Sequence, residues 1–186
     1  MVDRETVRHY LLVTFTLMCL CFLLRTQPDG RQEVLLGHKQ RGLGLGNVVG
    51  LGGKVESGED AQTAAARETL EESGIVVKRE DLRHAGTVIF DFPTKTAWNQ
   101  SVEVFVCETW SGDPVPCTEI VPEWHSTQVL PFARMWDDAR YWLPQVLAGA
   151  QITARFEYGP GCRTVAHAIV DTQPTSLGRH DGRQCA

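Results

Sequence analysis

Basic residues form no run or stripe in this chain of 186 residues, in which 23 acidic residues stand against 18 Lys and Arg. A protein that wraps nucleic acid needs such a stripe to neutralise phosphates, so we expect no nucleic acid polymer as a partner. Free nucleotides remain possible partners, because a metal ion can neutralise their phosphates instead.

The chain also has no apolar run of the roughly 20 residues that span a bilayer. The nearest is YLLVTFTLMCLCFLL (10–24), which is rich in Val, Thr, Leu, Cys and Phe and is soon followed by Pro-Asp-Gly. This composition predicts a buried strand that enters a turn, and no membrane partner. A secretory signal is the weaker alternative, since no small-residue cleavage site follows. A start of the protein near Met18 is another alternative.

The six cysteines include no CxxC pair. Cys19 and Cys21 are two residues apart on an expected strand, so they share a face without easily bonding each other. We therefore expect six reduced thiols in a cytoplasmic protein, most of them small core hydrophobes.

The order of elements predicts one domain with an α/β (α+β) fold, because strands and helices mix without strict βαβ alternation. We expect a mixed sheet with helices on its faces, an N-terminal extension (1–9), one domain (10–171) and a polar, disordered tail (172–186). No internal repeat is present. The expected strands are EVLLGHK, GTVIFDF, SVEVFVCETW and a closing hairpin of QITARFEYG and RTVAHAIVD, with a second helix in PFARMWDDARYWLPQVLAG.

The segment GGKVESGEDAQTAAARETLEESGI (52–75) predicts a helix that begins near Ser57–Gly58 and ends at Gly74. It places Glu68, Glu71 and Glu72 within one turn, where like charges destabilise a helix by roughly 0.2–0.5 kcal/mol per pair. These acids extend a face of small residues (Ala61, Ala64, Ala65) that packs closely against other backbone. Carboxylates on such a face are only partly hydrated, so they need a counter-charge.

A divalent cation is the best candidate for that charge, because Mg²⁺ prefers oxygen ligands and often shares them with substrate phosphates. The Gly-rich loop before the helix adds backbone groups, and the arrangement suits phosphate-ester or anhydride chemistry. The alternative is a solvated helix whose acids pair with Arg67, Lys78 or Arg79. For a bare E-x-x-E-E pattern, that alternative is the commoner one.

The wider spacing, however, resembles the Nudix box, G-x5-E-x7-R-E-U-x-E-E-x-G-U, where U is a bulky apolar residue. One packing position departs, since the first U is Thr69. Eight positions agree, namely Gly53, Glu59, Arg67, Glu68, Glu71, Glu72, Gly74 and Ile75.

The resemblance implies the Nudix fold, a mixed sheet between helices, and hydrolysis of a nucleoside diphosphate linked to another group. It implies a Mg²⁺ or Mn²⁺ site formed by Glu68, Glu71 and Glu72 with the Gly52 carbonyl. It also implies that Arg67 orients a glutamate through a salt bridge, while Glu59 is more structural than catalytic.

Several segments between 16 and 158 resemble one branch of that family, the oxidised purine nucleoside triphosphatases that act on 8-oxo-dGTP. They include EVLLGHKQRGLGLG, GTVIFDF and PFARMW. This resemblance implies an enzyme that cleaves a nucleoside triphosphate to monophosphate and pyrophosphate. It implies that Glu119 completes the metal site, with Glu123 as the alternative, and that Glu71 or Glu119 is the general base. We expect a monomer.

The same resemblance implies a base pocket in which Trp136 stacks on the purine and Asp138 hydrogen-bonds its edge. From the residues alone, Asp137 or Asp138 could equally be a helix N-cap. The remaining pocket residues implied are Phe90 and Phe92 beside the base, with Lys39, Gly53 and Lys54 toward the phosphates.

Two polar contacts to the base are missing relative to that branch. Val48 and Val49 replace a Trp-Asn pair, and Ala139 replaces a second aspartate; Asn47 compensates only if the loop register shifts. A pocket without its polar groups discriminates less well. Triphosphate hydrolysis is therefore better supported than 8-oxoguanine specificity. The alternatives are another nucleoside diphosphate derivative as substrate, or a non-catalytic nucleotide-binding protein.

Overall fold

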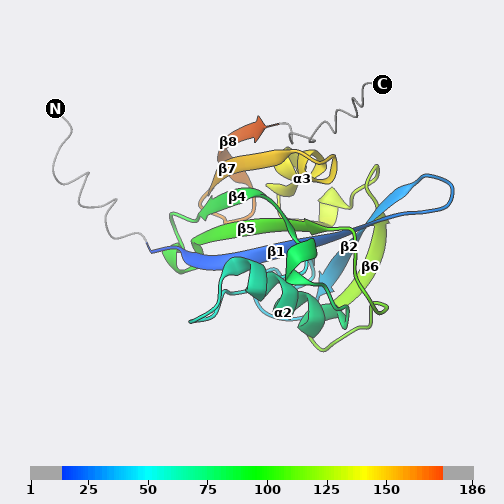
Figure 1. The fold of residues 1–186 in the computed structure, drawn as a ribbon. Coiled ribbons are helices and arrows are strands. Elements are labelled where there is room, and N and C mark those ends of the chain that lie inside the picture. Colours follow the sequence, from blue (N-terminus) through cyan, green and yellow to red (C-terminus); the bar gives the residue numbers. More distant parts are fainter. Residues whose placement is uncertain (1–13, 174–186) are drawn as a thin grey trace, which may run out of the picture.

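A single mixed sheet of eight strands organises the chain, whose computed structural model describes residues 14–173. The strand order is β3-β2-β1-β5-β4-β7-β8, and β6 pairs with β2 beside this path. Figure 1 shows β1, β5, β4, β7 and β8 stacked in that order. The strands are β1 (Thr16–Thr26), β2 (Gln32–Lys39), β3 (Val48–Val49), β4 (Arg83–Asp91), β5 (Gln100–Cys107), β6 (Ile120–Ser126), β7 (Gln151–Tyr158) and β8 (Val165–Gln173).

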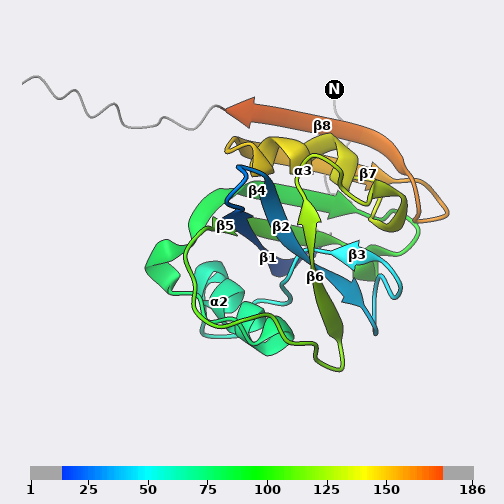
Figure 2. The ribbon, with the colours of Figure 1, turned by 90° about the vertical axis from the view of Figure 1, so that its right-hand side faces the viewer.

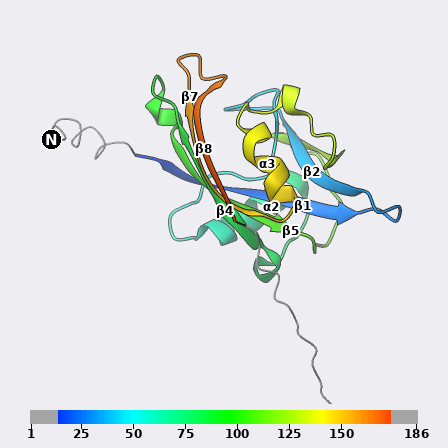
Figure 3. The same cartoon turned by 90° about the horizontal axis from the view of Figure 1, so that it is seen from above.

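Both faces of the central strands are buried, because β1 sends apolar side chains to each side. Phe22 and Leu24 belong to one core cluster, and Cys21 and Leu23 to the other. Helix α2 (Ala61–Ser73) covers the second cluster and α3 (Ala139–Leu147) the first, so the two helices lie on different sides of the sheet (Figure 2). Seen from above, α3 lies between the β7–β8 hairpin and β2 (Figure 3). The mixed sheet with helices on its faces is confirmed.

Asp60 is the N-cap residue of helix α2. The Asp60 carboxylate accepts the Thr63 N–H at 2.9 Å, which satisfies one of the free donors of the first turn. The expected start at Ser57–Gly58 is therefore wrong by about three residues. The expected end is confirmed, since Gly74 has φ +73° and its N–H bonds to the Leu70 carbonyl.

Thr69, the residue that departs from the Nudix box, is fully buried on α2. Its hydroxyl donates to the Ala65 carbonyl at 2.7 Å, so the polar group is satisfied within the helix. The substitution therefore leaves the packing face of α2 intact.

The structure differs from the expected strands in two respects, the presence of β6 and the end of β8. Strand β6 is absent from the expected strands, but it pairs with β2 over seven residues. The closing hairpin β7–β8 is confirmed, yet β8 continues to Gln173, so the tail cannot start at residue 172. The extension 1–9 and the tail from 174 lie outside the described residues.

The segment predicted as a buried strand forms β1 from Thr16 onward, while residues 10–13 fall outside the described range. Neither helix within that range has the length and apolar content to cross a bilayer. All five cysteines in the described range are free thiols, namely Cys19, Cys21, Cys107, Cys117 and Cys162. Cys19 and Cys21 are buried on one face of β1, as expected. Cys185 lies outside the described residues.

Candidate active site

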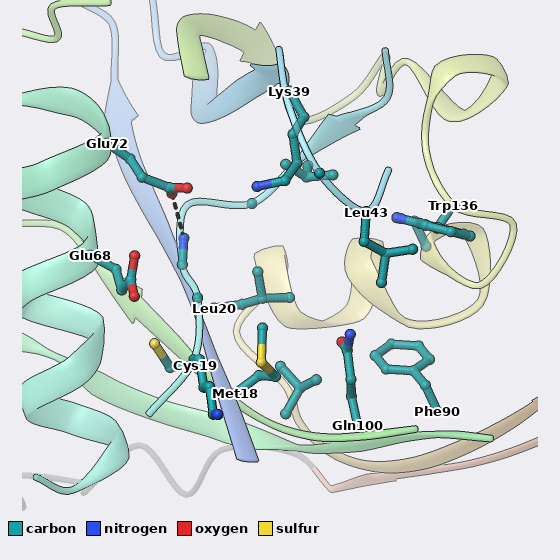
Figure 4. Close-up of a pocket in the computed structure, with 18 of the residues that line it drawn as sticks. Met18, Cys19, Leu20, Lys39, Leu43, Glu68, Glu72, Phe90, Gln100 and Trp136 are labelled. Atoms are coloured by element: carbon teal, nitrogen blue, oxygen red, sulfur yellow. Dashed lines mark hydrogen bonds between the residues drawn. The ribbon is translucent and has the colours of Figure 1, made fainter. Parts of the chain in front are cut away.

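One pocket of about 530 Å³ lies where α2, β1, β2 and the start of α3 meet (Figure 4). Its lining includes every residue that the sequence assigned to the site. At its acidic end are Gly52, Gly53, Lys54, Arg67, Glu68, Glu71, Glu72, Lys39 and Glu119, and at its aromatic end are Phe90, Phe92, Trp136 and Asp138.

Glu72 is the most deeply buried of the acids, with 5% of its surface exposed. The Gly52 N–H donates to its Oε2 at 2.7 Å (Figure 4). Burial raises the pKa of Glu72 to about 7, although this hydrogen bond and the Lys39 charge act in the opposite direction. A carboxylate held this way, close to other acids, is stabilised by any cation that enters the pocket.

The glycines before α2 let the backbone approach the acids. Gly52 has φ +149°, and a Cβ there would lie 2.1 Å from the Cys19 carbonyl oxygen. At Gly53, a Cβ would meet the Glu68 carboxylate at 2.5 Å. Larger residues would therefore push the loop off β1 or off the acids.

Arg67 holds three carboxylates at once. It contacts Glu59 at 2.7 and 3.3 Å, Glu68 Oε1 at 2.9 Å and Glu71 Oε2 at 3.3 Å. Burial raises the pKa of Glu68, and Arg67 opposes that rise. These contacts are those expected of a residue that orients glutamates, and Glu59 is an ion-pair partner of Arg67.

Glu119 is the residue immediately before β6, and its side chain lines the pocket. Its Oε1 accepts from Lys39 Nζ at 2.8 Å, and half of its side chain is exposed. Glu123, the alternative, is absent from the pocket lining and bonds His38 instead. Of the two, only Glu119 is therefore placed to complete the acidic end.

The acidic end fits a divalent metal ion. Its donors are oxygens alone, as Mg²⁺ and Mn²⁺ prefer. The pKa values of Glu68 and Glu72 are raised chiefly by burial, and each is raised further by the charge of Glu119, so these carboxylates lack full compensation from Arg67 and Lys39.

Aromatic rings build the other end of the pocket. Phe92 stacks on Tyr158 with centroids 4.5 Å apart, and Trp136 meets both rings edge-on. The Gly-rich loop lies against Trp136, since a Cβ on Gly44 would be 3.1 Å from its Nε1. Tyr158 and the pocket-lining Leu43 were not predicted as site residues, because they carry no motif of their own.

Asp138 is buried beneath this aromatic end. It accepts from Trp142 Nε1 at 2.7 Å and from the Tyr158 hydroxyl at 2.5 Å, and burial raises its pKa. It occupies the N-cap position of α3, as the alternative expected, but its side chain makes no capping hydrogen bond. Both carboxylate oxygens thus have protein donors already. Val49 and Ala139 line the pocket without polar groups, and Asn47 is not among its lining residues.

The sheet, the acidic helix and the glycine loop together define the Nudix fold. The family model for the NUDIX domain matches residues 20–146, so the chain belongs to the NUDIX domain family. Nudix hydrolases generally need divalent metal ions.

Two curated relatives extend this comparison. A protein of Danio rerio named "Oxidized purine nucleoside triphosphate hydrolase" is 38% identical over 86% of this chain and 98% of its own length. The Mus musculus protein of the same name is 37% identical over 68% of this chain and 80% of its own. Among solved structures, a MutT protein of Bacillus halodurans shares the fold, with a TM-score of 0.67 at 23% identity over 84% of this chain and 98% of that one.

The raised pKa of Glu72 predicts a pH-dependent stability of the metal-free protein. Between the ordinary value of 4.5 and about 7, the folded state binds more protons at Glu72 than the unfolded state does, so stability falls as pH rises through this window. A shift of this size corresponds to at most roughly 3 kcal/mol. In EDTA, Glu72→Gln should therefore melt above wild type at pH 8 and close to it at pH 4.5. Parallel melting profiles of the two proteins from pH 4.5 to 8 would contradict this.

Proposed function

We propose that the protein hydrolyses oxidised purine nucleoside triphosphates, such as 8-oxo-dGTP, to the monophosphate and pyrophosphate, with a divalent metal ion. The observation that carries the proposal is one pocket with carboxylates at one end and aromatic rings at the other. A nucleotide fits it lengthwise, with phosphates toward α2 and the base toward Trp136. The two curated relatives that carry this activity in their names support the same substrate class.

The metal ligands proposed are Glu68, Glu71, Glu72 and Glu119, with the Gly52 carbonyl. When bound, Mg²⁺ or Mn²⁺ neutralises phosphate charge and acidifies a nearby water. Arg67 orients Glu68 and Glu71. Lys39 lines the same pocket, and we propose that its ammonium group contacts a phosphate oxygen.

The reaction is a displacement at phosphorus. The oxygen of a water molecule bonds to the α-phosphorus, the bond from that phosphorus to its bridging oxygen breaks, and pyrophosphate leaves. The water proton passes to Glu71 or Glu119, whose side chains are 58% and 50% exposed and thus accessible to water. Glu72, which is buried and accepts the Gly52 N–H, is less accessible to that water.

Base recognition rests mainly on stacking. Trp136 supplies an aromatic edge of the pocket, and Phe90 and Phe92 supply apolar walls. Asp138 contacts the base only if its hydrogen bond from Tyr158 or Trp142 is shared or exchanged. We therefore propose a preference for oxidised purines that is weaker than in an enzyme with a full set of polar groups.

A substrate panel tests this proposal. Purified protein with Mg²⁺ is assayed for pyrophosphate release from oxidised and normal purine triphosphates, pyrimidine triphosphates, a dinucleotide and a nucleotide sugar. We expect the highest kcat/KM with an oxidised purine triphosphate. A dinucleotide or nucleotide sugar as best substrate would keep the metal site and overturn the substrate class; folded protein inactive on all of them would overturn the enzyme.

A further inference from the structure

Two histidines and a glutamate form a cluster on β2 and β6, away from the pocket. His38 lies on β2, and Glu123 and His125 lie on β6. One ligand atom of each lies within 4.8 Å of the other two. Within the described range, none of the three lines the pocket of the candidate active site.

Strand geometry explains why these three side chains meet. Glu123 pairs with Leu36 and His125 with Val34, and directly paired residues of antiparallel strands share a face. His38 is two residues beyond Leu36, so it projects from that face as well. Lys39, its neighbour, projects to the opposite face, toward Glu119. The sheet itself therefore separates this cluster from the acidic end of the pocket.

His125 carries the most informative atom of the cluster. Its side chain is 12% exposed, and its Nε2 is the one buried side-chain nitrogen or oxygen in residues 14–173 without a hydrogen-bond partner. Glu123 Oε2 lies 3.5 Å away but does not bond to it. Buried nitrogens are normally paired, so an unpaired one beside a carboxylate calls for a ligand.

We infer that His38, Glu123 and His125 bind a transition-metal ion of the Zn²⁺ class, distinct from the divalent ion of the acidic pocket. Two imidazoles and one carboxylate are a typical Zn²⁺ ligand set and a poor one for Mg²⁺. Glu123 is 56% exposed, so solvent can reach the site and a water can take the fourth position.

The two distances from Glu123 fit after a small adjustment, and the ligand atoms of the two histidines lie within 4.8 Å of each other. Tetrahedral Zn²⁺ with bonds of about 2.0–2.1 Å sets its ligand atoms about 3.3 Å apart. Glu123 Oε2 is 3.5 Å from His125 Nε2 and 2.6 Å from His38 Nε2. The shorter distance is a hydrogen bond, which must open by under an ångström when the metal replaces the shared proton.

The surrounding charges set the conditions for binding. His125 faces a carboxylate, Glu123, and a second imidazole, His38, within the cluster. Arg134 is the cation that faces the cluster, since its charge lowers the pKa values of both Glu123 and His125. Its side chain is exposed and can turn outward. A bound ion would cross-link β6 to β2, and Glu119 is the residue immediately before β6.

Zinc titration of the full chain tests the inference. The protein is titrated with Zn²⁺ against a chromophoric chelator, with saturating Mg²⁺ present to fill the acidic pocket. We expect one Zn²⁺ per chain, and affinities at least about tenfold weaker for His38→Gln and His125→Phe, a loss typical even of residues that only orient a ligand. Co²⁺ should give a visible spectrum of nitrogen and oxygen ligands, without thiolate bands.

The chain offers a matched control in His84, whose Nε2 also lies 2.6 Å from a glutamate, Glu103. Among residues 14–173, His84 belongs to no such cluster. His84→Gln should bind Zn²⁺ as wild type does, and Zn²⁺ should raise the melting temperature of both but not of His125→Phe. The inference is overturned if wild type binds no Zn²⁺, if all four proteins bind it equally, or if Co²⁺ shows thiolate bands that the histidine variants retain. His38→Gln, at a partly exposed position, decides the matter if His125→Phe does not fold.

Discussion

Glu72→Gln is expected to lower kcat by at least about a hundredfold while the protein stays folded. The change removes a charged metal ligand, and a metal ion contributes several kcal/mol to transition-state stabilisation in such reactions. The amide oxygen of Gln can still accept the Gly52 N–H, so the loop contact that holds this position is retained. Loss of activity should therefore reflect loss of charge and not loss of structure. Steady-state kinetics at saturating Mg²⁺, with the melting temperature in parallel, measure it.

An exposed acid outside the pocket provides the control for this experiment. Glu80 lies in the short helical turn after α2 and does not line the pocket. Glu80→Gln should keep wild-type kcat and KM. If Glu72→Gln keeps most of its activity as well, the acids of α2 hold no catalytic metal ion and the proposed metal site is wrong.

Trp136→Ala should raise KM by roughly tenfold to a hundredfold and leave kcat nearly unchanged. An aromatic ring stacked on a base contributes roughly 1–3 kcal/mol, and stacking acts equally in the ground state and the transition state. Such uniform binding shows in KM alone. Because Val49 and Ala139 offer the base no hydrogen bonds, stacking should account for a large share of its affinity. Both constants are measured on the best substrate of the panel.

Two further tryptophan-site variants sharpen that experiment. Trp136→Phe keeps an aromatic face and should recover most of the affinity. Trp110 stacks on Trp124 outside the pocket, so Trp110→Ala should leave KM unchanged. A collapse of kcat in Trp136→Ala with constant KM would mean that Trp136 positions the phosphates or the fold, and not the base.

The acidic end of the site could be predicted from the sequence because its geometry is local. Helical periodicity alone places Glu68, Glu71 and Glu72 together, and the glycines just before the helix bring the backbone to them. The family spacing then added Glu119 and the aromatic residues, which no local pattern would single out. The structure brings all of these residues to one pocket; their roles stay predictions.

The rest depends on contacts between distant segments, which spacing does not reveal. Strand β6 contains Pro122 and several polar residues, and it is a strand because β2 pairs with it. Asp138 was expected to face the base, but its partner Tyr158 is twenty residues away on β7. The cluster of His38, Glu123 and His125 could not be predicted from the sequence for the same reason, because the pairing register of β2 and β6 brings these residues together.

Product analysis of the reaction with 8-oxo-dGTP tests the central proposal most directly. Purified full-length protein is incubated with this nucleotide, with Mg²⁺ or with EDTA, and the products are separated and quantified. The proposal predicts 8-oxo-dGMP and pyrophosphate in equal amounts, with Mg²⁺ only. Folded protein that forms no product, or that releases the diphosphate and inorganic phosphate, would contradict it.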